Sequence, residues 1–307
     1  MNNSLLYLIT VLIWGSTWIA INFQLGEVAP EASIAYRFAI ASAILIIFCF
    51  ATKRSLKFDF SAHKQFMAFG LCLFSGNYYF VYTAQLHINS ALTCIAFSTL
   101  MLVNIINARI WYKTPITMQS YIGGLLGISG IGSLFWPELS DIDVSTDTII
   151  GLALCMVGVL LASTGNMISM NNQKKKLPLV QANTWGMFYG TVFMLIILFA
   201  TGKKLNFSTQ IEYISSLIYL ALFGSVIGFS CYLTLLNKIG AHKASYANIM
   251  FPAVAVALST FFEGFEWNAH TMIGFVCMII GNLVVLAKPI NIAVPFNQRN
   301  KKLLHRK

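Results

Sequence analysis

The chain has 307 residues, of which 57% are hydrophobic and only 10% are charged, and its mean hydropathy is +0.73. Soluble domains carry about 25% charged residues, so this composition excludes a soluble globular domain and indicates an integral membrane protein. The net charge of +10 does not indicate nucleic-acid binding, because the basic residues follow a membrane-orientation pattern.

Ten apolar segments long enough to cross a bilayer follow one another along the chain. A hydrocarbon core of roughly 30 Å takes about 20 helical residues. The first segment has no preceding Lys or Arg, so we interpret it as a permanent span and not as a secretory signal. The predicted spans are 4–23, 32–51, 65–85, 89–111, 117–136, 148–169, 179–200, 212–236, 243–262 and 268–287.

The charged residues separate to the two sides of these spans. With the N-terminus inside, 17 of the 20 Lys and Arg residues lie in cytoplasmic segments, and nine of the ten acidic residues lie outside. Basic residues concentrate in the cytoplasmic loops of membrane proteins. We therefore expect both termini in the cytoplasm, including a basic tail over 288–307.

The two halves of the chain repeat the order of their small and helix-breaking residues. The segment 13–17 (Ile-Trp-Gly-Ser-Thr) corresponds to 161–164 (Leu-Ala-Ser-Thr), and Pro30 corresponds to Pro178. Each half has five spans, an odd number, so the second half enters the membrane from the opposite side. Inverted repeats of this kind hold the substrate near the midplane of secondary transporters. The sequence predicts an all-α fold of ten helices in two inverted five-helix repeats, 4–136 and 148–287.

A proline and several glycines mark the last spans. Pro252 removes a backbone donor inside the ninth span, so neighbouring helices, hydroxyls or water must satisfy the freed carbonyl. Glu263 closes that span. Gly274 and Gly281 lie seven residues apart on one face of the tenth span, and Gly224-x-x-x-Gly228 occurs in the eighth. We interpret both spacings as signals for close helix packing.

The proline, the glutamate and the two glycines of the last spans resemble the end of the second repeat in EamA-type exporters of the drug/metabolite transporter superfamily. Trp14-Gly15-Ser16 is similar to the first-helix signature of that family, and Arg37 is similar to its second-helix arginine. The first half departs from the family pattern where Lys113 or Tyr112 stands near the position equivalent to Glu263, and it has no proline equivalent to Pro252. The resemblance implies a multi-pass protein of the bacterial inner membrane. It also implies export of a small metabolite, an amino acid or related amphiphile, by alternating access.

Polar and aromatic side chains within the spans are the candidates for a substrate cavity. Rings and amides on facing helices can hold a small amphiphilic molecule by stacking and neutral hydrogen bonds. One such residue alone is better explained as a contact between helices, whereas the set is better explained by a cavity. The candidate substrate-binding residues are Trp14, Trp18, Asn77, Tyr78, Tyr82, Asn166, Trp185, Ser230, Tyr246 and Asn248.

Arg37 is the one formally charged side chain well inside a predicted span, roughly 9 Å from the outer end of its helix. A charge in a membrane is costly and usually marks function or a partner. We predict a gate in which Arg37 pairs with Glu263 when the outer side closes and Pro252 bends the ninth helix. Direct contact between Arg37 and a substrate carboxylate stays open.

No enzyme motif is present, because G-x-S-x-G, H-E-x-x-H and P-loop sequences are missing. The six cysteines lie in apolar runs without C-x-x-C spacing. We therefore expect no enzymatic activity, no metal site and no cofactor. The expected partners are a small-molecule substrate and the lipid bilayer, not nucleic acid, and a homodimer stays open. The alternatives are an importer or exchanger on the same fold and, with less support, a polytopic membrane enzyme.

Overall fold

The structure is a computed structural model that describes residues 2–88, 90–136, 140, 145–262 and 267–286. Within these ranges all regular secondary structure is helical. The elements are α1 (Asn3–Asn22), α2 (Pro30–Ala51), α3 (Phe60–Phe69), η1 (Gly70–Gly76), α4 (Asn77–Ala84), α5 (Ser90–Ser98), α6 (Leu100–Tyr112), α7 (Met118–Leu134), α9 (Thr146–Lys174), α10 (Leu179–Ala200), α11 (Ile211–Tyr219), η2 (Leu220–Ile227), α12 (Gly228–Ile239), α13 (Ala241–Ala244), α14 (Ala247–Phe262) and α15 (Ala269–Leu286).

Short polar side chains and a proline set where several helices begin. Asp59 accepts a hydrogen bond from the backbone N–H of Ala62 at 3.0 Å at the start of α3. Thr117 and Ser145 cap the first turns of α7 and α9 in the same way. Pro30 occupies the first position of α2, where a helix needs no backbone donor. The loop sequences therefore determine these helix starts locally.

Within the described residues, seven helices are long and apolar enough to cross a membrane. They are Asn3–Asn22, Pro30–Ala51, Leu92–Tyr112, Thr146–Lys174, Leu179–Ala200, Ile211–Ile239 and Ala269–Leu286. Three predicted spans are not among these seven. The spans 117–136 and 243–262 contain the shorter helices α7, with 17 residues, and α14, with 16. The span 65–85 is divided among α3, η1 and α4. The predicted all-α membrane fold is confirmed, and seven of the ten predicted spans coincide with a helix of this kind.

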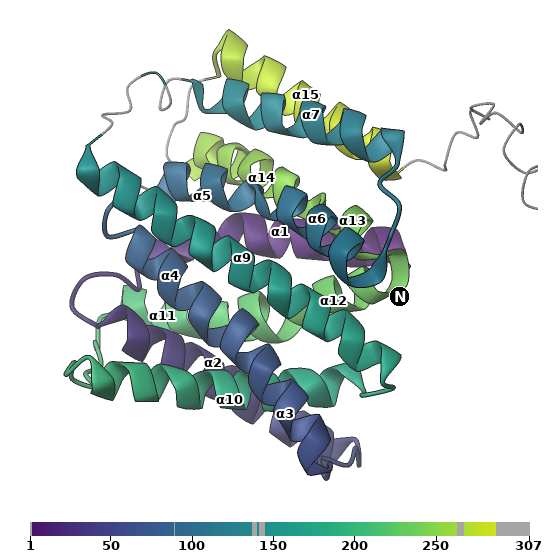
Figure 1. Ribbon diagram of the computed structural model, residues 1–307. Coiled ribbons are helices and arrows are strands. Elements are labelled where there is room, and N and C mark those ends of the chain that lie inside the picture. Colours follow the sequence, from purple (N-terminus) through teal and green to yellow (C-terminus); the bar gives the residue numbers. More distant parts are fainter. Residues whose placement is uncertain (1, 89, 137–139, 141–144, 263–266, 287–307) are drawn as a thin grey trace, which may run out of the picture.

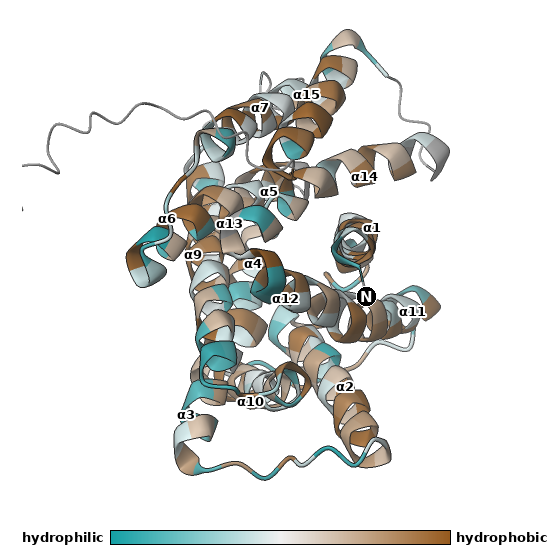
Figure 2. Cartoon of the chain, turned by 90° about the vertical axis from the view of Figure 1, so that its right-hand side faces the viewer, coloured by the Kyte–Doolittle hydropathy of each residue, from teal (hydrophilic) through white to brown (hydrophobic). Residues whose placement is uncertain are grey.

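Hydrophobic residues make up much of the helices (Figure 2). Large hydrophobic side chains on different helices are exposed, among them Phe50, Ile110, Leu125, Ile196 and Leu283. In water such a surface would be a site of association. In a bilayer it faces acyl chains, so these residues need no protein partner.

Contacts between helices of the first half and helices of the second half follow a symmetric pattern. Helix α2 packs along α10 and α7 along α15, at opposite edges of the molecule (Figure 1). Between these edges α1 packs on α12 and α14, and α9 packs on α4 and α6. Each contact of α1 with the second half therefore has a counterpart in a contact of α9 with the first.

A π-helical segment interrupts the same predicted span in each half. Segment η1 joins α3 to α4, and η2 joins α11 to α12. The sequence predicts these regions only as the spans 65–85 and 212–236. A π segment shifts the main-chain hydrogen bonds away from the α pattern, and such segments concentrate at functional sites.

Glycines allow α7 and α15 to approach each other closely. A Cβ atom at Gly274 would lie 2.5 Å from the carbonyl oxygen of Gly130, and one at Gly123 would lie 2.7 Å from the carbonyl oxygen of Gly281. Real Cβ atoms essentially never come nearer than 3.0 Å to such atoms. The predicted close contact through Gly274 and Gly281 is confirmed, and its partner is α7.

A large cluster of buried apolar side chains joins α1, α2, η1, α9 and α12. The ring of Phe74 lies 5.4 Å from that of Phe38 and 4.9 Å from that of Phe229, measured between centroids. The first pair is tilted and the second is edge-to-face, and ring contacts at such distances are favourable. This cluster holds both halves of the chain together beside the site described next.

Candidate functional site

A cavity of about 70 Å³ lies between helices of both halves. It has room for a few water molecules and is well below the roughly 300–1,000 Å³ of pockets that hold small ligands. A metabolite can therefore enter only if the walls move apart. The cavity is lined by Trp14, Thr17, Trp18, Ile21, Arg37, Leu73, Asn77, Tyr78, Val81, Phe97, Leu100, Ala162, Asn166, Phe229, Tyr232 and Phe251.

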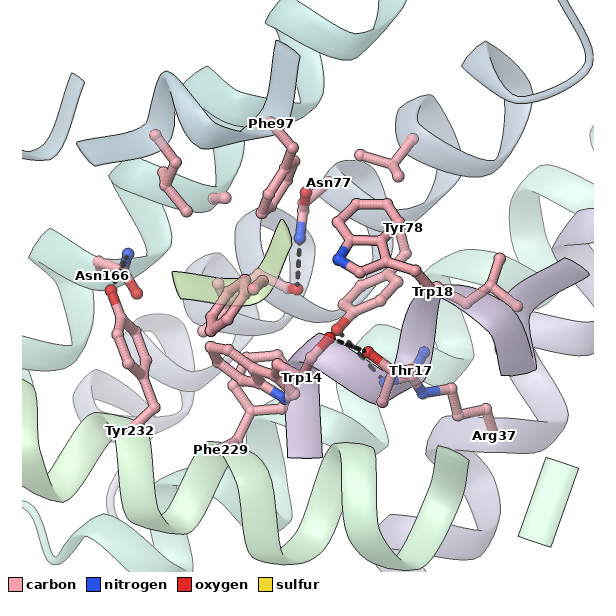
Figure 3. Close-up of a pocket in the computed structure, with 16 residues that line it drawn as sticks. Trp14, Thr17, Trp18, Arg37, Asn77, Tyr78, Phe97, Asn166, Phe229 and Tyr232 are labelled. Carbon is pink, nitrogen blue, oxygen red and sulfur yellow. Dashed lines mark hydrogen bonds between the residues drawn. The ribbon is translucent and has the colours of Figure 1, made fainter. Parts of the chain in front are cut away.

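Aromatic rings from five helices form much of the wall, with Tyr78 of α4 among them. The Trp14 ring on α1 lies 4.8 Å from Phe229 and 4.9 Å from Tyr232, both on α12, and 5.8 Å from Phe251 on α14. Trp18 lies one helical turn further along α1 and packs edge-to-face on Phe97 of α5 at 5.8 Å (Figure 3). Such a wall favours a ligand with an apolar body.

Helix α12 and the π segment before it fix the position of Trp14. The indole N–H donates to the carbonyl oxygen of Gly224 in η2 at 2.9 Å. A Cβ atom at Gly228 would lie 2.6 Å from the indole nitrogen, so only glycine leaves room for the ring there. The sequence indicates a packing role for Gly224 and Gly228, and the structure adds that they seat a side chain of the cavity.

Arg37 lies at one end of the cavity, and Asn166 and Tyr232 lie at the other (Figure 3). The Arg37 side chain is buried, with 2% of its surface exposed. Its Nε donates to Ser225 Oγ of η2 at 2.9 Å, and its Nη2 donates to the Tyr78 hydroxyl at 3.4 Å. The guanidinium carbon also lies 4.7 Å from the centre of the Tyr78 ring. Arg37 therefore connects α2 with both halves of the chain.

Asparagines provide the amide groups of the site. Asn166 Nδ2 donates to Asn104 Oδ1 and to the Tyr232 hydroxyl, each at 3.3 Å, and Asn104 Nδ2 donates to Ser245 Oγ at 2.8 Å. The Oδ1 atoms of Asn166 and Asn77 are buried and accept no hydrogen bond from the described residues. A buried acceptor without a donor is costly, so these oxygens are suited to a ligand or to water.

Five of the ten candidate substrate-binding residues line the cavity together: Trp14, Trp18, Asn77, Tyr78 and Asn166. They come from α1, α4 and α9, which are distant in sequence and all contribute to the wall of this cavity. Their direct contact with a substrate stays a prediction. Their gathering around one cavity is what the structure adds.

The other five candidates lie elsewhere. Tyr82 is buried on α4 beside Tyr78, with 6.3 Å between the ring centres. Ser230 Oγ donates to a backbone carbonyl of its own helix at 2.6 Å. The Tyr246 hydroxyl donates to the Ser120 carbonyl on α7 at 2.6 Å. These three side chains are thus held by contacts within or between helices.

Trp185 and Asn248 are also outside the cavity walls. The Trp185 indole donates to the Leu56 carbonyl at 3.1 Å and packs against the His63 ring at 4.7 Å. This places Trp185 beside the loop that joins α2 to α3. Asn248 is buried at the start of α14, and neither of its amide atoms has a hydrogen-bond partner among the described residues.

The structure does not test the predicted pairing of Arg37 with Glu263, because Glu263 lies outside the described residues. Pro252 lies inside α14 and is buried. Next to it, α14 approaches α1 closely: a Cβ atom at Gly15 would lie 2.6 Å from Val254 Cβ and 3.2 Å from the Phe251 carbonyl oxygen. The proline thus lies where the ninth predicted span touches the first.

Several wall residues were not among the sequence candidates, notably Thr17, Phe229 and Tyr232, together with Ser225 behind Arg37. Phe229 and Tyr232 look like ordinary residues of an apolar helix. A usable signal was the Gly224-x-x-x-Gly228 spacing, because it marks the helix face that receives Trp14. Within the described part of the chain, no three His, Cys, Asp or Glu side chains are grouped to hold a metal ion.

Comparison with known proteins gives consistent results over the whole length. Protein PagO of Salmonella typhimurium is 25% identical over 294 residues, 92% of each chain. The uncharacterized inner membrane transporter YedA of Escherichia coli is 24% identical over 91% of each chain. The uncharacterized transporter YoaV of Bacillus subtilis is 22% identical over 80% of this chain and 83% of its own. A protein solved by crystallography shares the fold, with a TM-score of 0.78 and 15% identity over 92% of this chain and 96% of its own.

The model of the EamA-like transporter family matches residues 2–136 and again residues 149–287. The two matched stretches cover most of the chain, and both contribute residues to the wall of the cavity. Together with seven helices, among those described, that can cross a bilayer, this identifies a multi-pass membrane protein. The chain belongs to the EamA-like transporter family.

Proposed function

We propose that the protein is a secondary transporter that exports a small metabolite, an amino acid or related amphiphilic compound, across the bacterial inner membrane. It works by alternating access, with ten membrane spans arranged as two inverted five-helix repeats. Membership of the EamA-like transporter family and the names of YedA and YoaV support transport and not enzymatic catalysis. The direction and the substrate class are proposals that go beyond these names.

The observation that carries the proposal is the cavity, whose wall comes from both matched halves. Alternating access requires a site at the interface of two bodies that move against each other. Helix α1 contacts the second half as α9 contacts the first, and each half has one π segment. Both observations support two related repeats. In this structure the cavity is too small for a metabolite, as expected for a contracted form of the site.

Contacts between loops support the proposed topology, with both termini in the cytoplasm. Lys203 Nζ pairs with Glu31 Oε1 at 2.7 Å, and His87 Nδ1 lies 2.8 Å from Asp147 Oδ1. Each contact joins two segments that the distribution of charge assigns to the outer side. A ten-span arrangement brings these segments to the same face of the membrane.

The test compares membrane vesicles of both orientations from cells that produce the protein and from cells with an empty vector. Sealed vesicles are incubated with a metabolite extract, and their contents are measured by mass spectrometry. Export predicts accumulation of one or a few compounds in inside-out vesicles only, because their outer surface is the cytoplasmic face. A Gly132→Ala variant serves as a folded control, since a Cβ atom there meets nothing within 4 Å.

Each other outcome contradicts part of the proposal. Accumulation only in right-side-out vesicles indicates an importer, and uptake that needs a loaded counter-substrate indicates an exchanger. Chemical conversion of a compound without accumulation indicates a membrane enzyme. Identical contents in producing and control vesicles of both orientations refute transport of the compounds in the extract.

A further inference from the structure

Arg37 carries a buried positive charge whose hydrogen bonds are incomplete. A guanidinium has five N–H donors. Nε and Nη2 reach the hydroxyl oxygens of Ser225 and Tyr78, whereas Nη1 is buried and has no hydrogen-bond partner among the described residues. No carboxylate in the part of the chain that the structure describes pairs with Arg37. The ion pair of Lys203 and the contact of His87 with Asp147 found there do not involve Arg37.

The energetics of a membrane interior make this arrangement informative. Moving a charge out of water is costly unless an opposite charge and hydrogen bonds compensate it. Hydroxyl groups and the face of the Tyr78 ring stabilise the guanidinium in part, but they carry no net negative charge. A group with a negative charge and two acceptor oxygens would complete the shell, because a guanidinium binds a carboxylate through two parallel hydrogen bonds.

The cavity in front of Arg37 defines the rest of such a ligand. None of its wall residues is acidic, so the cavity offers no opposite charge to an ammonium group. Most of the wall is apolar or aromatic. The unpartnered amide oxygens of Asn77 and Asn166 accept hydrogen bonds from neutral donors as well as from charged ones. The site therefore requires one negative group and tolerates, without requiring, an amine.

Building on the proposed transport function, we propose that Arg37 is the carboxylate receptor of the cavity and that the substrates are small carboxylates with an apolar body. The carboxylate binds the free edge of the guanidinium that includes Nη1. The body of the substrate lies among the rings of Trp14, Trp18 and Phe229. Cationic amphiphiles without a carboxylate are excluded, because they would place a second positive charge beside Arg37.

The experiment measures binding of four probes to the full-length protein in detergent micelles by isothermal titration calorimetry. The probes share a phenyl ring: 3-phenylpropionate carries only a carboxylate, phenylalanine carries a carboxylate and an amine, 3-phenylpropanamide is neutral, and phenethylamine carries only an amine. We expect both carboxylates to bind at least about tenfold more tightly than the neutral amide and the amine, as a hydrogen-bonded charge pair requires.

Variants of Arg37 test whether this residue causes the preference for carboxylates. In Arg37→Gln, 3-phenylpropionate should bind no better than its amide, and Arg37→Lys should retain part of the preference. Arg54→Gln is the matched control, because Arg54 is exposed beyond the end of α2 and lies over the Phe48 ring. If Arg37→Gln does not fold, Arg37→Lys carries the test, and a carboxylate preference equal to that of the unchanged protein would then contradict the assignment.

The assignment is overturned if the amide or the amine binds as tightly as the carboxylates, if neither carboxylate binds, or if a folded Arg37→Gln variant keeps the preference. Vesicle transport is measured separately with the metabolite extract. Transport of a compound that lacks a carboxylate would refute the carboxylate receptor and leave the transporter function standing. Absence of any transport, with carboxylate binding intact, would refute the function and leave the binding site standing.

Discussion

Replacing Gly228 with alanine tests how closely α1 and α12 must approach at the cavity. The added Cβ atom would lie 2.6 Å from Trp14 Nε1 and 3.1 Å from the Phe223 carbonyl oxygen. Ordinary van der Waals contact begins at 3.4 Å, so the indole must retreat by about 0.8 Å. Its hydrogen bond to the carbonyl of Gly224, four residues before Gly228 in η2, is 2.9 Å long. Retreat stretches it to about 3.7 Å, which is no longer a hydrogen bond.

The expected cost follows from these two effects. Loss of the hydrogen bond contributes about 1 kcal/mol, and overpacking of a filled site contributes about 1–3 kcal/mol. Alanine also gains roughly 1 kcal/mol of helix propensity over glycine. This gain is the same in Gly132→Ala on α7, where the new Cβ atom meets nothing within 4 Å. Relative to that control, Gly228→Ala should lower the free energy of unfolding by about 2–4 kcal/mol.

The assay is unfolding by sodium dodecyl sulfate in mixed micelles, with vesicle transport as the second measurement. Gly228→Ala should unfold at a lower denaturant fraction than Gly132→Ala and transport more slowly, because Trp14 lines the cavity. Equal stability and equal transport of the two variants would show that the α1–α12 contact accommodates the added methyl group, and would refute the reasoning.

Three further predictions address topology and gating. In a background without native cysteines, an impermeant reagent applied to whole cells should label Ser140→Cys and not Lys175→Cys; the reverse pattern contradicts the proposed orientation. Pro252→Ala should slow transport while the protein stays inserted and folded, and unchanged kinetics would mean that the proline is incidental. If Arg37 pairs with Glu263 as a gate, alanine at either position should raise outer accessibility and the double variant should be no worse than either single one. Strictly additive effects would rule out the pair.

The fold could be predicted from sequence where one physical requirement dominates. Long apolar segments must become helices in a bilayer, because every backbone polar group needs an internal partner there. The close contact of α15 was also predictable, since Gly274 and Gly281 share one helical face. The π segments were not, because a π turn leaves no compositional mark distinct from that of an apolar α-helix. Their positions depend on packing between helices.

The site was predictable in part for a related reason. Trp14, Asn77 and Asn166 are polar or amphipathic groups in apolar spans, and such groups need a partner, a cavity or an interface. The same argument applies to Trp185 and Tyr246, whose partners are the Leu56 and Ser120 carbonyls. Sequence identifies groups that need a partner. It does not tell a partner in the protein from a partner in a ligand.

Segment η2 contacts both the aromatic wall of the cavity and Arg37. Trp14 donates to the Gly224 carbonyl, and Arg37 donates to the hydroxyl of Ser225, the next residue in the chain. Both side chains come from the first half, and both acceptors belong to the second. Because a π segment differs from an α-helix in hydrogen-bond register, a return of η2 to the α pattern would move both acceptors together. The aromatic wall and the guanidinium would then change position in one step, and such coupling is what a site needs in order to open to one side of the membrane at a time.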